Sequence, residues 1–271
     1  MPIPNFFSVL FIFLKREWRT LYPSSWALVS LPFAELFTLT IYWFTAKALS
    51  PKLEFQHAIG SDYFQYIVVG ELTLLIPAAF LYGYSKIARE LIATRGIDYL
   101  AVQPFSKVRF LVEMGIAMAL MRLVNMAFTL LLLIIFFSTA LPPLALTKMI
   151  LLVLSSLPSF FGLGLMAISL ILVSGRGERL VVMVSNASYV LAGVYFPTQV
   201  FPSQLERILN IVSPFNLLLN SVRKAFLNPG EQNLLADMGE LFLGGLVSFA
   251  LGWAALRVAF ARFHRRQRPL I

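Results

Sequence analysis

The sequence predicts an all-α integral membrane protein with six transmembrane helices, an N-terminal interfacial helix, a short cytoplasmic helix and a re-entrant helical hairpin before the last span. Three observations predict this class. Of the 271 residues, 59% are hydrophobic and only 13% are charged, which is about half the charged fraction of a soluble domain. The mean hydropathy is +0.80. The apolar residues also form long runs separated by basic connections. We expect residues 1–271 to form a single transmembrane domain.

The membrane-spanning segments are predicted from their length, because a helix needs about 20 mostly apolar residues to cross a bilayer. Five or six stretches meet this requirement, and they lie near Trp26–Ala46, Tyr63–Tyr84, Phe110–Ala140, Met149–Val173, Leu180–Tyr195 and Leu241–Phe260.

The segment before the first span, residues 1–22, predicts a helix that lies in the membrane interface. Its apolar residues recur at helical spacing on one face, namely Phe7, Leu10, Phe11, Leu14, Trp18 and Leu21. Arg16 and Arg19 fall roughly opposite, as in an interfacial helix. The alternative is a signal peptide, whose basic residues precede the apolar run. Here Lys15, Arg16 and Arg19 follow it, so the interfacial helix is favoured.

The basic residues predict the orientation, because cytoplasmic loops carry the excess of Lys and Arg. With the N-terminus inside, the cytoplasmic segments contain Lys15, Arg16, Arg19, Lys86, Arg89, Arg95, Lys107, Arg109, Arg176, Arg179, Arg257, Arg262, Arg265, Arg266 and Arg268. The outside segments contain only Lys47, Lys52, Lys148, Arg207, Arg223 and Lys224. We therefore expect six crossings of the cytoplasmic (inner) membrane, with both termini cytoplasmic. The basic tail, residues 262–271, is predicted to contact membrane lipids and not nucleic acid.

Residues 196–226 are apolar but interrupted by Pro197, Pro202 and Pro214. Proline is favoured at the first position of a helix, so two short helices are predicted near Pro202–Val212 and Pro214–Phe226. Neither is long enough to cross a bilayer. We interpret the segment as a re-entrant hairpin that enters the membrane from the outside. An amphipathic pair of helices lying flat on the outer surface is the alternative.

Several kinds of chemistry are absent from the sequence. There is no cysteine, and the two histidines, His57 and His264, are far apart. No phosphate loop of the form GxxxxGK[ST] occurs, and neither HExxH nor GxSxG is present. We expect this chain to have no catalytic residues and to bind neither a cofactor nor a metal ion.

Glu35, Glu71 and Arg122 lie in or near the predicted spans. An ionisable side chain inside a membrane is costly and marks a candidate functional site. The competing interpretations are an ion pair between helices and a side chain that reaches the interface from near a helix end. We retain these residues as possible intramembrane polar pairs or parts of a transport path.

The loop at residues 85–109 predicts a short amphipathic helix between the second and third spans. Ser85 can cap this helix, and its face carries Ile87, Leu91 and Thr94. Gly96 is suited to end it. Such a helix, joined to two spans, is accessible to a partner protein. A plain interfacial helix without a partner is the alternative.

This loop resembles the one in type-2 ABC transporter permeases, where an Arg-Glu pair precedes a Gly-Thr-x-Glu-x-Leu-x-x-Thr-Pro-like segment. The matching stretch is Arg89-Glu90 followed by Gly96-Ile97-Asp98-Tyr99-Leu100-Ala101-Val102-Gln103-Pro104. Ile97, Asp98 and Gln103 depart from the family's Thr, Glu and Thr.

A second stretch resembles the family's Gly-x-x-Phe-Pro, Leu-Pro, Asn-Pro and Arg pattern. It comprises Ala192-Gly193-Val194-Tyr195-Phe196-Pro197, then Val200-Phe201-Pro202, Leu205, Ser213-Pro214-Phe215 and Arg223. Ser213 replaces the usual Asn. The two stretches occur in the family's order on six predicted spans that follow an interfacial helix. The resemblance in this arrangement extends over nearly the whole chain.

The resemblance implies that two permease chains, expected as a homodimer, form a path through the membrane for export. Two copies of a separate ABC ATPase subunit would bind ATP and Mg, so this chain would not itself be an enzyme. The coupling helix near Ser85–Thr94 would dock on the ATPase, supported by the N-terminal helix. Its expected contact residues are Lys86, Arg89, Glu90, Leu91, Gly96 and Asp98.

The same resemblance implies that residues 196–226 close the outer end of the path, with Phe196, Pro197, Pro202 and Pro214 in the gate. The family mostly exports amphipathic cargo such as lipids, polysaccharides or drugs. Two alternatives come from other classes. An ion-coupled secondary transporter would use Glu35 or Glu71 in place of an ATPase. A membrane-embedded enzyme or assembly factor would show polar residues clustered at one depth.

Overall fold

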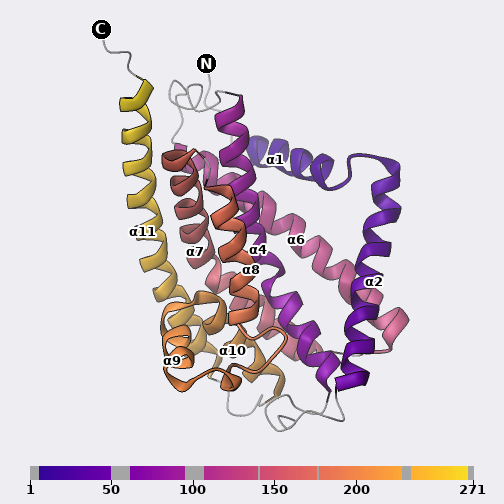
Figure 1. Cartoon of the computed structure of the whole chain (residues 1–271). Helices are drawn as coiled ribbons and strands as arrows, with labels where there is room; N and C mark the ends of the chain where they lie inside the picture. The colour runs from indigo at the N-terminus through magenta and orange to yellow at the C-terminus, as the bar shows by residue number, and fades with distance from the viewer. Residues whose placement is uncertain are drawn as a thin grey trace.

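A computed structural model describes residues 6–49, 62–94, 107–139, 141–175, 177–227 and 233–267. These residues form helices and connecting turns, with no strand among them. The helices are α1 (Phe6–Leu21), α2 (Ser25–Leu49), α4 (Tyr63–Ala93), α6 (Lys107–Phe137), α7 (Pro143–Ser174), α8 (Glu178–Leu191), the 3-10 helix η2 (Thr198–Val200), α9 (Ser203–Val212), α10 (Pro214–Leu227) and α11 (Leu234–Gln267). Figure 1 shows them as one bundle.

Within the described residues, five helices are long and apolar enough to cross a membrane, namely α2, α4, α6, α7 and α11. They run between two ends of the bundle in Figure 1. We call the end near which α1 lies the α1 end, and the opposite end, where α9 and α10 lie, the hairpin end. The prediction of an all-helical, multi-pass membrane protein is confirmed.

The sequence predicts a helix over Leu180–Tyr195 as the fifth span, and these helix bounds are wrong. Helix α8 covers only Glu178–Leu191, a length of about 21 Å against a hydrocarbon core of about 30 Å. It ends because the backbone turns at Gly193, which has a φ of 81°. The apolar run continued past this turn in the sequence, so composition alone suggested a longer helix. The count of six crossings stays a prediction.

The N-terminal helix is present as α1, which packs against α6 and runs sideways between α4 and the start of α2 in Figure 1. Phe13 is buried against the bundle, where its ring meets that of Phe110 edge-on at 5.2 Å. Phe7 and Phe11, by contrast, are 79% and 67% exposed. Exposed aromatic side chains on a helix at the end of a membrane bundle are consistent with an interfacial position.

The prediction of a separate short helix over Ser85–Thr94 is also wrong. Helix α4 continues without a break through this region and ends at Ala93, with Thr94 as its C-cap. Ser85 does not cap a helix, because its hydroxyl donates to the Leu81 carbonyl one turn earlier within α4. The segment is therefore the final part of a 31-residue helix that begins at the hairpin end.

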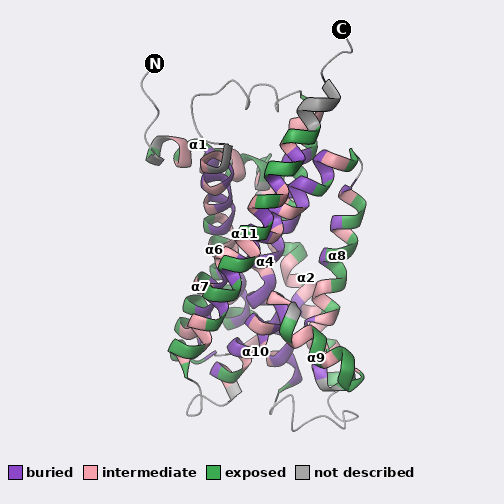
Figure 2. Cartoon of the chain, turned by 90° about the vertical axis from the view of Figure 1, so that its left-hand side faces the viewer, coloured by how far each residue is buried: buried purple, intermediate pink, exposed green. Residues whose placement is uncertain are grey.

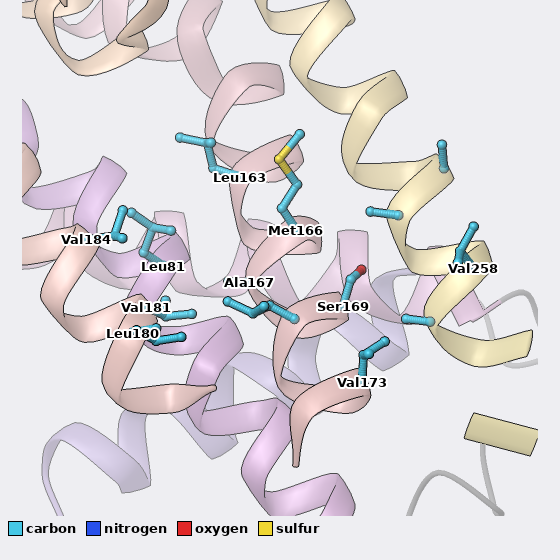
Figure 3. Close-up of a pocket in the computed structure, with 14 residues that line it drawn as sticks. Leu81, Leu163, Met166, Ala167, Ser169, Val173, Leu180, Val181, Val184 and Val258 are labelled. Carbon is cyan, nitrogen blue, oxygen red and sulfur yellow. The ribbon is translucent and has the colours of Figure 1, made fainter. Parts of the chain in front are cut away.

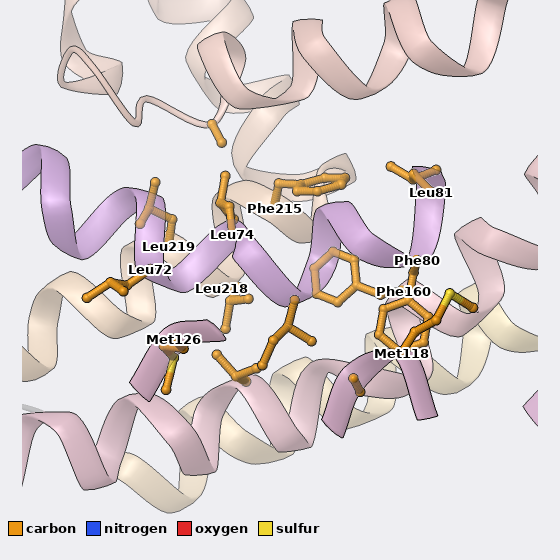
Figure 4. Close-up of a cluster of buried hydrophobic side chains, with 14 of the residues drawn as sticks. Leu72, Leu74, Phe80, Leu81, Met118, Met126, Phe160, Phe215, Leu218 and Leu219 are labelled. Carbon is orange, nitrogen blue, oxygen red and sulfur yellow. The ribbon is translucent and has the colours of Figure 1, made fainter. Parts of the chain in front are cut away.

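The core lies between α4, α6 and α7, as the purple residues in Figure 2 and the cluster in Figure 4 show. Phe80 and Tyr84 from α4 and Phe160 from α7 are fully buried. The Tyr84 hydroxyl donates to the Leu111 carbonyl on α6 at 2.7 Å. A Cβ at Gly164 would lie 2.2 Å from the Tyr84 ring, so this glycine makes room for the ring.

Helices α7 and α11 make the most extensive contact between two helices in the described chain. Small residues allow their backbones to approach, as in many membrane helix pairs. A Cβ at Gly162 would lie 2.3 Å from the Ser248 backbone, and one at Gly252 would lie 2.3 Å from the Gly162 carbonyl oxygen. Helix α2 is different, since most of its surface faces outward.

The proline-broken segment forms two short helices, as predicted. Pro202 is the N-cap of α9 and Pro214 is the first residue of α10. Helix α10 packs against α4, α7 and α11, with Leu218 and Leu219 fully buried. Helix α9 lies outside it at the hairpin end and exposes Ile208 and Ile211. Whether the pair enters a membrane stays a prediction.

Candidate functional site

The end of α4 is tied to two other helices by ion pairs at the α1 end. Glu90 pairs with Arg16 of α1, and the adjacent Arg89 pairs with Glu178 of α8 at 3.3 Å. All four side chains remain at least one-third exposed. The spacing of apolar residues placed Arg16 opposite the apolar face of its helix. Its contact with Glu90, which is distant in the sequence, could not be predicted from that spacing.

The other expected coupling residues have different surroundings. Lys86 is exposed and lines a cavity beneath α1. Leu91 is half-buried and packs against the core. Gly96 and Asp98 lie outside the described residues. Of the six residues, Lys86, Arg89 and Glu90 therefore present charge at the accessible end of α4.

A cavity of about 350 Å³ lies between α1, α2, α4 and α6. Glu35 and Arg122, both predicted as intramembrane polar residues, line it together with Asn125 and Thr129. The Thr129 hydroxyl donates to the Glu35 carboxylate at 2.9 Å. Arg122 has no ion pair among the described residues. The structure thus brings two of the three residues to one space.

Arg122 also lines a second cavity of about 220 Å³, closer to the α1 end. Arg16, Glu17 and Lys86 line the same space. Burial raises the pKa of the Glu17 carboxyl, while the neighbouring cations Arg16, Lys86 and Arg122 act in the opposite direction. Together the two cavities place cationic and acidic groups beneath α1.

Glu71, the third intramembrane residue, lies apart from these cavities on α4. Its Oε2 atom is buried and has no hydrogen-bond partner within the described part of the chain. An unsatisfied buried carboxyl oxygen costs free energy and calls for an explanation. Glu71 is therefore the most unusual of the polar residues found from the sequence.

Three of the expected gate residues lie in the connection between α8 and α9, and the fourth, Pro214, is the first residue of α10. Pro197 is buried and precedes η2, whereas Phe196 is 49% exposed. Pro202 is exposed and Pro214 is half-buried. Phe196, Pro197 and Pro202 therefore share one connection, and α9 separates them from Pro214 in the sequence.

Arg223 was not among the predicted site residues, although it belongs to the second stretch of resemblance. Its guanidinium donates to the Gly193 carbonyl at 2.7 Å and lies 3.7 Å from the centre of the Tyr66 ring. Tyr66 donates to the same carbonyl at 3.1 Å, and Tyr63 donates to the Tyr195 carbonyl at 2.8 Å. Side chains from α4 and α10 therefore hold the turn after α8.

Among the described residues, no group of three histidine or acidic side chains is placed to hold a metal ion. Comparison with known families and with characterised proteins finds no family model and no protein that matches this chain. The geometry described above is therefore the basis of the functional argument.

Proposed function

We propose that this chain is the transmembrane permease subunit of an ATP-driven ABC exporter. In this proposal two copies form the cargo path, and two separate ATPase subunits bind ATP and Mg at the α1 end. In this proposal the protein lies in the inner membrane, and its α1 end faces the cytoplasm. The cargo is amphipathic, such as a lipid, a polysaccharide or a drug.

The observation that carries the proposal is the arrangement of α1, α4 and α8 at one end. Glu90 and Arg89, the last charged residues of α4 in the described chain, pair with Arg16 and Glu178 of the two neighbouring helices. Because α4 is a single helix from end to end, a displacement of this end by a partner is transmitted through the bundle. A subunit driven by an external ATPase requires such a connection.

The opposite end supports the same proposal. Turn residues 193–195 are held by Tyr63, Tyr66 and Arg223, and Tyr63 and Tyr66 belong to the first turn of α4. One helix therefore contacts both the expected ATPase side and the expected outer gate. This arrangement allows opening of the gate to follow movement at the α1 end.

A second candidate is an ion-coupled secondary transporter, which one specific observation favours. Glu71 has a buried carboxyl oxygen without a partner in the described chain, and titratable groups at membrane depth are typical of proton relays. In that case transport depends on an ion gradient and on Glu71, and not on an ATPase.

Reconstitution into proteoliposomes with the ABC ATPase encoded nearest to the gene tests the proposal. We expect Glu90→Ala to uncouple ATP hydrolysis from transport of a fluorescent phospholipid and to lower ATP-dependent transport several-fold. Folding is expected to change little, because an exposed ion pair contributes only about 0.2–1 kcal/mol. The double variant R16E/E90R restores the pair with reversed charge and should recover part of the transport.

Arg19→Gln, a change at an exposed arginine of α1, serves as the matched control and should behave as the wild type. Unchanged coupling in Glu90→Ala would contradict the role of this end of α4. Transport that proceeds without the ATPase, requires a proton gradient and is lost in Glu71→Gln would instead establish the second candidate.

A further inference from the structure

The cavities of the described chain differ in whether their walls can select a ligand. The cavity between α7, α8 and α11, shown in Figure 3, is lined by aliphatic and methionine side chains apart from Ser169. The Ser169 hydroxyl already donates to the Leu165 carbonyl of its own helix. The two cavities beneath α1, both of which Arg122 lines, have charged as well as apolar walls. These two cavities can therefore discriminate between ligands.

Arg122 is a cation within a membrane-spanning helix and has no counter-ion at contact distance. It lies midway along α6 (Lys107–Phe137). It forms no ion pair with any residue that the structure describes. A charge inside a span is costly unless a neighbouring group balances it. An anion bound in either cavity would supply that balance.

The smaller cavity, of about 220 Å³, collects cations from three helices, namely Arg16 of α1, Lys86 of α4 and Arg122 of α6. Glu90 balances Arg16, but Lys86 forms no ion pair within the described ranges. Glu17 is the acidic residue among the described residues of this lining, and burial raises the pKa of its carboxyl, which favours the uncharged form. This space therefore suits an anion.

The larger cavity offers room for a hydrocarbon chain. Its volume of about 350 Å³ lies within the range of ligand pockets, about 300–1,000 Å³. The space exists because α2 packs only lightly on α4 and α6. Its apolar and aromatic walls are Trp18, Tyr22, Leu31, Pro32, Leu75 and Phe128.

The order of the two cavities matches an amphiphile that lies in the membrane from the α1 end. On α4, Lys86 of the smaller cavity is nearer that end than Leu75 of the larger one, by roughly three helical turns. Glu35 lines the larger cavity, where its carboxylate accepts from the Thr129 hydroxyl at 2.9 Å. A carboxylate there disfavours a second anion, so it favours one orientation of the ligand.

We propose that the two cavities together bind an amphipathic anion, with its phosphate or carboxylate between Arg122 and Lys86 and its hydrocarbon chain in the larger cavity. The planar fork of an arginine matches the oxygens of either group. In this way the structure gives a class to the cargo. The role as a cargo site rests on the transport function proposed above, whereas the binding itself needs no ATPase.

The binding test uses the full chain in dodecyl maltoside micelles without an ATPase. In the triple variant W26F/W43F/W253F, Trp18 is the one tryptophan that remains, and it lines the larger cavity. Bromine quenches tryptophan fluorescence on contact, so a dodecyl chain with bromine at its end reports its own arrival. The same brominated chain is titrated as a phosphate, as a trimethylammonium and as a maltoside.

We expect the phosphate to quench Trp18 at a concentration about tenfold or more below that of the other two headgroups. Tenfold corresponds to about 1.4 kcal/mol, and a hydrogen bond to a charged group contributes at least as much. In the same background R122Q should abolish this preference. R122K should keep part of it, because lysine retains the charge but not the fork.

The matched control is R207Q, which removes an exposed arginine of α9 that has no ion pair among the described residues. It should bind as the parent variant does. Unbrominated dodecyl phosphate and inorganic phosphate are then compared as competitors. Displacement by dodecyl phosphate alone supports an amphiphile site, whereas equal displacement by inorganic phosphate would show a site for the free ion and contradict the role of the larger cavity.

Equal quenching by the three headgroups, or unchanged binding in R122Q, would overturn the proposal. A brominated phosphocholine that binds more tightly than the phosphate, with the advantage lost in E35Q, would instead show a zwitterionic ligand held by Arg122 and Glu35. Thermal unfolding in detergent identifies a misfolded variant, and K86Q, at an exposed position, replaces R122Q in that case.

The outcome for this site is separate from the outcome for the transport function. Absence of anion binding while ATP-dependent transport still depends on Glu90 would refute the site and leave the transport function standing. Anion binding that depends on Arg122, without any ATP-dependent transport, would establish the site and refute its role in export.

Discussion

Glu17 lies outside the membrane-spanning helices, and its surroundings alter the ionisation of its carboxyl group. It lies on α1 and lines the cavity that Arg122 shares. Burial raises the pKa of its carboxyl, with Arg16 and Lys86 opposing the effect. The folded protein therefore holds a proton on Glu17 in a range of pH where the unfolded chain has released it.

This difference predicts how stability changes with pH. Where the folded state binds more protons than the unfolded state, the free energy of unfolding falls as the pH rises. We therefore expect the wild type to lose stability relative to Glu17→Gln as the pH rises from about 4 through the raised pKa of Glu17. The measurement is the difference between their melting temperatures in detergent at a series of pH values. A wild type that gains on the variant with rising pH would contradict the prediction.

Some features of single residues could be predicted from the sequence, and others could not. Glu35, Glu71 and Arg122 could be singled out from the sequence, because a charge in an apolar run is visible there. The sequence does not show that Glu35 and Arg122 line one cavity and that Glu71 does not. The Arg16–Glu90 pair joins positions 74 residues apart, and no local pattern predicts such a contact.

At the scale of elements, the glycine contact between α7 and α11 makes a separate prediction. Gly252→Ala places a methyl group 2.3 Å from the Gly162 carbonyl oxygen, so the two backbones must move apart. Overpacking of this kind costs about 1–3 kcal/mol. We expect a lower melting temperature in detergent for Gly252→Ala.

Gly244→Ala is the matched control for that prediction, because it lies on the same helix and a Cβ there meets nothing within 4 Å. It should leave the melting temperature unchanged or raise it slightly, since alanine favours the helix more than glycine does. Equal destabilisation by the two substitutions would show that the close contact is not the cause.

The sequence predicted those elements best whose ends are marked by proline or charge. Pro202 and Pro214 gave the starts of α9 and α10 to within a residue, because proline restricts the backbone locally. It failed where an apolar run passes through a turn, as at Gly193 after α8, and where a polar segment continues a buried helix, as at Ser85 in α4. In α8 the left-handed turn at Gly193 ends the helix within an apolar run, and in α4 the burial of Ser85, Ile87 and Ala88 carries the helix past the point where composition changes.

For the whole molecule, the arrangement of helices predicts which positions share a side of the membrane. Arg19 of α1 and Arg262 of α11 lie at the α1 end, whereas Ala48 of α2 and Asn233 before α11 lie at the hairpin end. The chain has no cysteine, so a single introduced cysteine carries all the label. We expect cysteines at Arg19 and Arg262 to react with an impermeant maleimide from one side, and those at Ala48 and Asn233 from the other.

If cysteines at positions 19 and 48 are labelled from the same side, α2 does not cross the membrane. The result also decides the path of α8 and its hairpin. Since α11 begins at the hairpin end, α8 together with the turn after it must bring the chain to that side. Labelling of position 233 from the same side as position 48, and of position 262 from the same side as position 19, would therefore support six crossings, although only five helices in the described part of the chain have the length of a span.

The α7–α11 contact has a consequence for how the protein is made. Gly162 is synthesised well before Gly252, and ribosomes add about 5–20 residues per second. For several seconds the glycine face of α7 is therefore in the membrane without the helix that will cover it. During this interval the nascent chain is exposed to wrong pairing, and a chain cut short before α11 would keep this face open. The α7 face is thus covered only once α11 has been made, and membrane proteases that survey unfinished proteins would find this face uncovered in chains truncated before α11.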